Sequence, residues 1–327
     1  MKVKKIVFIT GTRADFGKLR ILIDRIEKSR KFDCHIFVTG MHTLARYGFT
    51  FKEIEKRGYK NLYLYMNQSE SHSQDIILSN TIIGFSNFVK EIKPDMIVVH
   101  GDRLEPLACA LVGAFNNILV CHIEGGEITG SIDEMIRHSI SKLSHLHMVS
   151  NKRARNRLIQ MGENKNSIFV IGSPDIDVMM GKELPTKSDL LDYYKIPFKK
   201  YATLIYHPVT TSLEVLHYEI NNLLSAVVQS KRDYIIIYPN NDPGSEIILK
   251  EYEKIKNNKH FRIFPSLRFE YFLTLLKTSD FIIGNSSAGI TEAEIYGTPT
   301  INVGIRQSNR SHSKTIINVN NSVETVS

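Results

Sequence analysis

Short apolar runs alternate with segments of helical periodicity along almost the whole chain, and this alternation limits the possible folds more than any other feature. The runs 6–9 and 96–99 are apolar without interruption, whereas Leu19, Leu22 and Ile23 recur at the spacing of one helix face. Strands that are apolar on both faces are typical of parallel sheets covered by helices on both sides. We therefore predict an α/β fold built on a doubly wound parallel sheet.

Length and a change of composition indicate two domains. A chain of 327 residues holds about two domains of roughly 150 residues each. After Gly172 a polar stretch with Pro185 and Pro197 interrupts the strand–helix rhythm, as is typical of a domain boundary. We predict two Rossmann-like domains that face each other across a cleft, at residues 1–172 and 186–327.

Each domain is expected to repeat the strand–helix unit. In the first domain we predict strands at 4–10, 34–39, 62–65, 96–100, 118–122, 146–150 and 168–171, and helices over the 19–26 pattern and at 44–57, 74–91, 104–115, 133–143 and 152–161. In the second we predict strands at 202–206, 234–238, 261–264, 281–283 and 300–303, and helices at 213–229, 245–256, 268–276 and 288–296.

Charge and cysteine content exclude several function classes. The formal net charge is +8, but the basic residues are scattered and form no nucleic-acid module. We therefore expect no nucleic-acid partner and a solvated basic surface, which is also compatible with a phosphorylated metabolite. No apolar run reaches the roughly 18 to 20 residues of a membrane span, so no membrane partner is expected. Cys34, Cys109 and Cys121 each lie in an apolar run, which indicates reduced core residues in the cytoplasm.

Acidic and basic residues follow two of the predicted strands. His100-Gly-Asp-Arg follows the run 96–99, and His122-Ile-Glu-Gly-Gly-Glu follows the run 118–120. Ligands of open α/β sheets bind outside the carboxyl ends of the strands, so Asp102 and Glu124 are expected in one crevice. Paired carboxylates in different environments serve general acid–base catalysis. The two acids are our candidate catalytic residues.

The helix predicted after this stretch adds a second charged pair. Asp133 and Arg137 lie four residues apart on one helix face and are expected at the cleft, Arg137 as a substrate contact. The alternative is an exposed salt bridge worth about 0.3 to 0.5 kcal/mol. Arg103 either pairs with the neighbouring Asp102 or binds a ligand phosphate. The histidines lack the spacing of a metal site, so no metal is expected.

Phosphate-site patterns occur in both predicted domains. Arg13 lies in a polar turn between the first strand and the first helix, where backbone N–H groups and a guanidinium favour anions. Ser286 and Ser287 lie in a small-residue turn before the helix that carries Glu292. This turn is suited to a diphosphate, and it is equally a good helix cap. Glu292 has two interpretations also, as a partner for ribose hydroxyls or as a first-turn helix acid.

Eight ordered motifs together resemble one enzyme family. They are GTRADFG, HGDR, HIEGGE, IRHSISKLSH, YHPVTT, YPNND, GNSSAG and RQSNR. This set closely resembles the hydrolysing UDP-N-acetylglucosamine 2-epimerases of bacterial sialic acid synthesis, from Ile6 to about Arg310. The resemblance implies the two-domain GT-B fold, no cofactor, a homo-oligomer, and conversion of UDP-GlcNAc to UDP and free N-acetylmannosamine by elimination of UDP and hydration of a 2-acetamidoglucal.

The resemblance also implies roles for individual residues. Asp102 and Glu124 would handle proton transfers, with Asp133 assisting and His207 near the diphosphate. The positions that match the family's UDP-binding residues are Arg13, Arg103, Ser286, Ser287, Glu292 and Arg306, with further contacts from Asn240 and His207. The first domain would thus carry the acids that act on the sugar, and the second would bind UDP. Relatives continue for several tens of residues past the equivalent of Arg310, so the usual C-terminal helices are expected to be missing from this sequence.

Three other functions stay open from the sequence. The same chemistry could act on UDP-2,4-diacetamido-2,4,6-trideoxyglucose, as in legionaminic-type pathways. A GT-B glycosyltransferase would share the fold, and its activity would depend on an added acceptor. A catalytically silent nucleotide-sugar-binding protein is the third possibility, and the acids at the strand ends argue against it.

Overall fold

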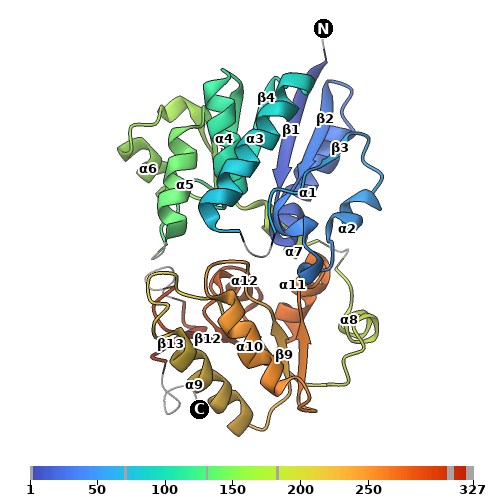
Figure 1. The fold of residues 1–327 in the computed structure, drawn as a ribbon, viewed down its shortest axis with the longest axis vertical. Helices are drawn as coiled ribbons and strands as arrows, with labels where there is room; N and C mark the ends of the chain where they lie inside the picture. Colours follow the sequence, from blue (N-terminus) through green and yellow to red (C-terminus); the bar gives the residue numbers. More distant parts are fainter. Residues whose placement is uncertain (1–2, 70–71, 130–131, 182–183, 308–312, 322–327) are drawn as a thin grey trace. The chain divides into compact units, whose positions relative to one another are not determined.

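The computed structural model describes residues 3–69, 72–129, 132–181, 184–307 and 313–321. The chain forms two compact units: unit 1 comprises 1–128 and 132–180, and unit 2 comprises 129–131 and 181–327. Each unit is built on its own parallel sheet (Figure 1). The predicted α/β class with two Rossmann-like units is therefore confirmed.

Within its described residues, unit 1 has a seven-stranded parallel sheet in the order β3-β2-β1-β4-β5-β6-β7. The strands are β1 (Lys4–Thr10), β2 (Phe32–Val38), β3 (Leu62–Leu64), β4 (Met96–His100), β5 (Leu119–Ile123), β6 (Leu146–Val149) and β7 (Ile168–Val170). The chain winds outward from β1 to β3 and then returns to β4 on the other side of β1. This reversal between β1 and β4 is the topological switch point, beside which α/β folds bind ligands.

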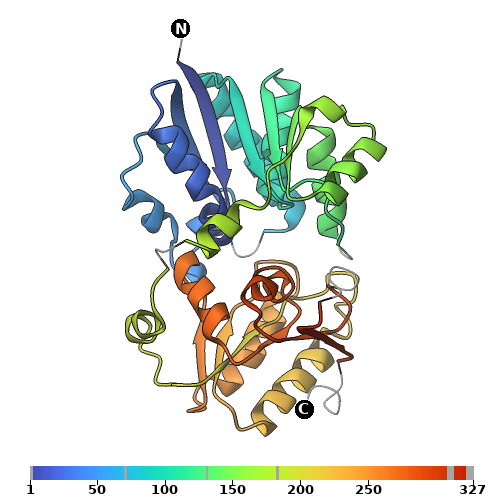
Figure 2. The same cartoon turned by 180° about the vertical axis from the view of Figure 1, so that it is seen from behind.

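Helices cover both faces of this sheet (Figure 2). They are α1 (Arg13–Glu27), α2 (Phe51–Glu55), α3 (Gln74–Ile92), α4 (Leu104–Phe115), α5 (Ile132–Lys142), α6 (Lys152–Gln160) and α7 (Pro174–Met179). Val7 and Ile9 of β1 pack with α3 and α4, whereas Ile6 and Phe8 pack on the opposite face with α1. Because successive side chains of a strand point to opposite faces, both sets are buried and the strand is apolar without interruption.

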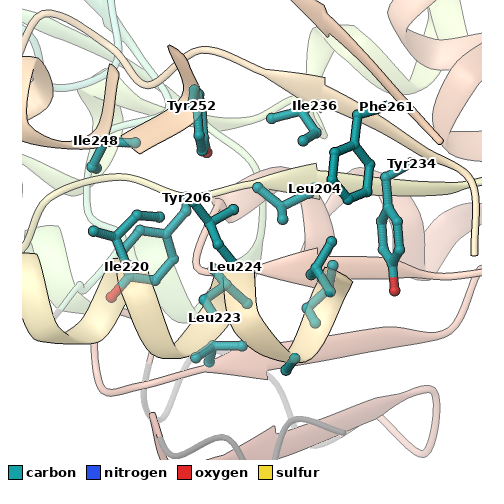
Figure 3. Packing of buried hydrophobic residues seen from close by; sticks show 14 of the residues in the cluster. Leu204, Tyr206, Ile220, Leu223, Leu224, Tyr234, Ile236, Ile248, Tyr252 and Phe261 are labelled. Carbon is teal, nitrogen blue, oxygen red and sulfur yellow. The ribbon is translucent and has the colours of Figure 1, made fainter. Parts of the chain in front are cut away.

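In the described part of unit 2, the sheet has six parallel strands in the order β10-β9-β8-β11-β12-β13. The strands are β8 (Ala202–Ile205), β9 (Tyr234–Ile237), β10 (Phe261–Phe264), β11 (Ile282–Gly284), β12 (Thr300–Val303) and β13 (Ile316–Val319). The helices are α8 (Lys187–Tyr193), α9 (Leu216–Gln229), α10 (Ser245–Ile255), α11 (Phe269–Thr278) and α12 (Glu292–Tyr296). Figure 3 shows Ile220, Leu223 and Leu224 of α9 in one apolar cluster with Leu204 of β8. Each fully buried aliphatic side chain of this kind stabilises the fold by about 1.5 to 3 kcal/mol.

Two predicted helices are shorter in the structure than their periodicity indicated. The segment predicted as helix 44–57 contains the 3-10 turn Ala45–Tyr47 and the short α2, separated by Gly48 and Phe49. Both of these residues have positive φ, at 84° and 48°, which a continuous right-handed helix does not permit. The segment predicted as helix 288–296 likewise divides into the 3-10 turn Ser287–Gly289 and α12.

The polar stretch that sequence analysis treated as a break contains two helices. In α7 Pro174 occupies the first turn, where its missing N–H costs nothing. In α8 Thr186 and Asp189 form a capping box. Both helices are shorter than two full turns, so their hydrophobic periodicity is too brief to predict them. No helix in the described ranges combines the length and the apolar character that crossing a bilayer requires.

Two fully buried histidines are held as neutral rings inside unit 1. Burial lowers the pKa of His42 to about 4; Asp15 and the Thr12 backbone oppose this shift and Arg13 adds to it, each with a smaller effect. Burial lowers the pKa of His122 to about 3. The His122 Nε2 lies 2.8 Å from the Gly101 carbonyl, which can only accept, so Nε2 donates and Nδ1 faces Ser141 Oγ at 3.0 Å as the acceptor. Protonation of either ring would place a charge in the core.

We predict that the free energy of unfolding falls as the pH drops from 6.5 toward 5. The unfolded chain takes up protons at these histidines near pH 6.5, whereas the native chain does not until about pH 4 or 3. Each histidine then costs up to about 1.4 kcal/mol per pH unit. Urea unfolding at pH 7.5, 6.5, 5.5 and 5.0 measures the slope. His122→Asn should reduce it, the exposed control His72→Gln should not, and a flat profile would refute the neutral buried rings.

Candidate functional site

Neighbouring strands bring the two candidate acids of unit 1 to one edge of the sheet. Strands β4 and β5 pair in parallel, with His100 opposite Ile123 at their carboxyl ends. Asp102 lies two residues after the end of β4, and Glu124 directly follows β5. Their loops therefore leave the sheet side by side, next to the switch point between β1 and β4.

Glu124 lies among polar and charged groups from three other segments. His100 Nε2 donates to its Oε2 at 3.1 Å, Ser173 Oγ donates to Oε1, and Lys18 Nζ lies 3.6 Å from Oε2. Burial by itself raises the pKa of Glu124, but the charges of Lys18 and His100 and the two hydrogen bonds outweigh it and hold the pKa well below its usual range. At neutral pH Glu124 is therefore an ionised carboxylate, and 17% of its side-chain surface is exposed.

The backbone around Glu124 explains the two glycines that follow it. Glu124 itself has a φ of +62°, a conformation that is uncommon for a residue with a side chain and that marks functional sites. A Cβ on Gly125 would lie 2.8 Å from His122 Nδ1 and from Ser141 Oγ. Gly126 has a φ of +80°, and its Cβ would lie 2.6 Å from the carbonyl oxygen of Ala154. Glycine at both positions lets the loop pack closely and turn the Glu124 side chain toward its partners.

Asp102 forms an ion pair with Arg137, which reaches it from α5. Arg137 is 4% exposed, and its Nη2 donates to Asp102 Oδ2 while its Nη1 donates to the Glu127 carbonyl at 2.9 Å. The guanidinium thus ties the loop after β4 to the loop after β5. Spacing along the helix indicated Asp133 as a neighbour of Arg137, and it could not reveal this long-range partner.

The remaining candidates of unit 1 lie at helix starts. Asp133 is half-buried in the first turn of α5. Arg103 precedes α4, and its Nε lies 3.6 Å from Oε2 of the buried Glu105. Arg13 is the first residue of α1, and its guanidinium is engaged by Glu53 of α2, with Nε 3.1 Å from Oε2 and Nη2 on Oε1. The predicted phosphate contacts of both arginines stay predictions.

Asn285 organises the candidate residues of unit 2. Its Oδ1 accepts from the His207 N–H at 2.7 Å, and its Nδ2 donates to the His207 carbonyl at 2.8 Å. Its own carbonyl accepts from Arg306 Nη1 at 3.2 Å and from Gln307 Nε2 at 3.1 Å. The preceding Gly284 has a φ of +134°, and a Cβ there would meet the Ile205 carbonyl oxygen at 1.9 Å. Strands β8 and β11 approach closely at this point. Asn285, which directly follows β11 and precedes the serine turn, can therefore bond His207, which comes after β8.

The other predicted residues of unit 2 surround this junction. The Asn240 N–H donates to His207 Nδ1 at 3.2 Å, which fixes Nδ1 as an acceptor. Ser286 caps the 3-10 turn by accepting from the Ala288 N–H at 3.3 Å, and the Ser287 carbonyl accepts from Thr291 N–H at 2.9 Å. Glu292 is buried and accepts from its neighbour Thr291. The helix-cap interpretation of the turn is therefore confirmed, and its phosphate interpretation stays a prediction.

Sequence reasoning missed Lys18, Ser173 and Asn285, which contact these candidates, and Asp175, which contacts Lys18. Asn285 and Ser173 each follow the last strand residue of a predicted unit by one to three positions, a placement that could have drawn attention to them. Lys18 and Asp175 lie in helices that pack together only in the tertiary structure, so nothing local in the sequence pointed to them.

Comparison with known proteins identifies the family. A family model described as UDP-N-acetylglucosamine 2-epimerase matches residues 24–327. A UDP-N-acetylglucosamine 2-epimerase of Neisseria meningitidis serogroup B is 50% identical over 315 residues, which cover 96% of this chain and 83% of that protein. A hydrolysing UDP-N,N'-diacetylbacillosamine 2-epimerase of Legionella pneumophila is 35% identical, covering 97% of this chain and 85% of that protein. The polysialic acid biosynthesis protein P7 of Escherichia coli is 34% identical, covering 97% and 83%.

Solved structures agree on the fold. The UDP-GlcNAc 2-epimerase of Methanocaldococcus jannaschii in complex with UDP-GlcNAc and UDP superposes with a TM-score of 0.80 at 22% identity, covering 98% of this chain and 90% of that one. The Staphylococcus aureus MnaA–UDP structure gives a TM-score of 0.76 at 20% identity, covering 99% and 86%. With a family model that spans most of its length and a relative at 50% identity, this chain belongs to the UDP-N-acetylglucosamine 2-epimerase family.

Proposed function

We propose that this chain is a hydrolysing UDP-GlcNAc 2-epimerase, which converts UDP-GlcNAc and water to UDP and N-acetylmannosamine for sialic acid synthesis. The observation that carries the proposal is the ionised, partly buried Glu124 directly after β5, with the Asp102–Arg137 pair after the neighbouring strand β4. The relative from Neisseria meningitidis and the polysialic acid protein of Escherichia coli support the reaction and its biosynthetic setting.

The relatives favour UDP-GlcNAc over the diacetamido sugar as the substrate. The 2-epimerase named for UDP-N-acetylglucosamine is 50% identical to this chain, whereas the one named for UDP-N,N'-diacetylbacillosamine is 35% identical. Both cover more than nine-tenths of the chain, so the difference is not an effect of partial alignment. The hydrolysing type is supported by the second of these names and by the HIEGGE and SIDEMIRH motifs.

The first step is the elimination of UDP. A base takes the C2 proton, its electron pair forms the C1–C2 double bond, and the C1–O bond breaks to release UDP and leave a 2-acetamidoglucal. The C2 proton is weakly acidic, so the base must be ionised and correctly placed. Glu124 meets the first requirement, because Lys18, His100 and Ser173 stabilise its charged form.

The second step is the hydration of the glycal. Water adds its oxygen to C1, and a proton returns to C2 on the face opposite to the one it left, which gives the manno configuration. Asp102 is the second carboxyl at this edge of the sheet, and it is held by Arg137. We assign it to a proton transfer in this sequence, with Asp133 assisting from the first turn of α5.

The leaving diphosphate requires positive and N–H groups. In unit 2 the junction at Asn285 gathers His207, Arg306 and the serine turn. We propose that the UDP-binding residues of unit 2 are His207, Asn240, Ser286, Ser287, Glu292 and Arg306. For unit 1, taken by itself, we propose Arg13, Arg103 and Arg137 as substrate contacts. Stabilising the departing charge in this way lowers the barrier to elimination. A homo-oligomer and a cytoplasmic location stay predictions.

The reaction is tested by its products in deuterated water. Incubation with UDP-GlcNAc and no acceptor should yield UDP and N-acetylmannosamine with deuterium at C2, as measured by NMR. Unlabelled N-acetylglucosamine would refute elimination, and UDP-ManNAc would indicate the non-hydrolysing reaction. Turnover that requires an added acceptor would instead identify a glycosyltransferase, and UDP-GlcNAc binding without turnover a silent binding protein.

We expect Asp102→Asn and Glu124→Gln each to lower kcat by about 10² to 10⁴, the usual contribution of a general acid or base. UDP binding, measured by calorimetry, should change little because the leaving-group contacts are assigned elsewhere. The exposed Glu55→Gln is the matched control and should retain full activity. Near-normal rates in both acid variants would overturn the catalytic assignment.

Asn285→Ala should weaken UDP binding about tenfold or more. The change leaves the His207 N–H and carbonyl without their partners, and each buried unsatisfied group costs about 1 to 3 kcal/mol. Calorimetric titration with UDP measures the loss, and circular dichroism confirms that unit 2 is folded. The exposed Asn257→Ala provides the control. Unchanged UDP affinity in the folded variant would show that the junction does not organise the binding residues.

A further inference from the structure

A buried carboxylate, that of Asp175, shares Lys18 with Glu124. Asp175 is 3% exposed, and its Oδ2 lies 3.2 Å from Lys18 Nζ. The same Nζ lies 3.6 Å from Glu124 Oε2. The other carboxylate oxygen of Asp175, Oδ1, has no hydrogen-bond partner among the described residues. One ammonium group is thus shared between the buried carboxylate of Asp175 and the partly buried carboxylate of Glu124.

Tertiary packing within unit 1 creates this arrangement. Lys18 lies in α1, which begins at the end of β1, and Asp175 lies in the first turn of α7. Helices α1 and α7 pack against each other. The residue before α7, Ser173, donates to Glu124 directly. The start of α7 therefore reaches Glu124 twice, once through a hydroxyl and once through the ammonium of Lys18.

We propose that Asp175 is a positioning residue for Glu124, because it holds Lys18 between the two carboxylates and limits the positive charge that Glu124 experiences. The proposal rests on the proposed function for its catalytic meaning, since Glu124 is the base only if the elimination takes place. The effect of Asp175 on the charge state of Glu124 does not depend on turnover.

Charged and ionisable side chains from four elements lie around Glu124. They are Lys18 from α1 and His100 from β4, with Asp175 from α7 beyond Lys18 and His122 of β5 next to His100. An opposite charge within about 4 to 6 Å favours the ionised form of a carboxyl, and a like charge disfavours it. An ammonium that served Glu124 alone would stabilise its anion further. A carboxylate stabilised in that way would be a weaker base toward the C2 proton.

Three variants separate this role from a general structural one. Lys18→Gln removes the positive charge that both carboxylates share and leaves their mutual repulsion uncompensated, so the titration midpoint of Glu124 should rise by about one pH unit or more. Adding Asp175→Asn to that variant removes the repulsion and should bring the midpoint back down. Asp175→Asn alone, which preserves the shape of the side chain, should lower the midpoint below that of the unaltered protein. Asp177→Asn, an exposed change on the same helix, is the control and should have no effect.

The midpoint is read directly by carbon-13 NMR of the protein labelled at the glutamate carboxyl, with the Glu124 signal assigned by its loss in Glu124→Gln. Folding of each variant is checked by circular dichroism, and Asp175→Asn alone decides the outcome if Lys18→Gln does not fold. Equal midpoints for Lys18→Gln and the double variant, or an unchanged midpoint in folded Asp175→Asn, would overturn the proposal.

The acid limb of kcat/KM against pH should move with the NMR midpoint in the active variants. If the unaltered protein makes neither UDP nor N-acetylmannosamine, the proposed function fails while the NMR comparison still decides the role of Asp175. If the protein is active and the NMR midpoints do not move, the role of Asp175 alone fails. The two failures are therefore distinguishable in one set of samples.

Discussion

Burial of both faces of a parallel sheet is the constraint on which the rest of this structure depends. In unit 1 alternate residues of β1 pack against helices on opposite sides, so the strand has no face left for polar side chains. The acids of the candidate site therefore lie beyond the strand ends and in the first turns of helices. The candidate acids, Asp102 and Glu124, occupy such positions because no other place near the sheet admits an ionised group.

Charge compensation then decides how those groups behave. Glu124 is buried, which would favour its neutral form, yet Lys18, His100 and Ser173 reverse that preference. Asp102 is neutralised by Arg137, which also anchors the neighbouring loop through the Glu127 carbonyl. The same side chains therefore serve stability and chemistry. Removing one partner of such a pair leaves the other charge uncompensated.

In unit 2 the uncharged side chain of Asn285, rather than an ion pair, holds the candidate residues in place. Asn285 satisfies the backbone N–H and carbonyl of His207 and accepts from Arg306 and Gln307, so one amide residue replaces a network of charges. Gly284 permits the close approach of strands that this junction needs. A rigid junction of this kind suits the binding of a diphosphate, whose charge is best met by groups that are already in place.

Local patterns in the sequence determined the α/β class, most strand positions and the placement of the acids at strand ends, because hydrophobic periodicity and strand-end chemistry act over a few residues. They failed where a positive φ at Gly48 and Phe49 broke a periodic segment, and where α7 and α8 were too short to show a period. Only the tertiary structure decided that Arg137 pairs with Asp102 and that Lys18 and Asp175 stand behind Glu124. These partners are 35 to 157 positions apart along the chain, and it is the parallel crossover connections and helix packing that bring them within hydrogen-bonding reach.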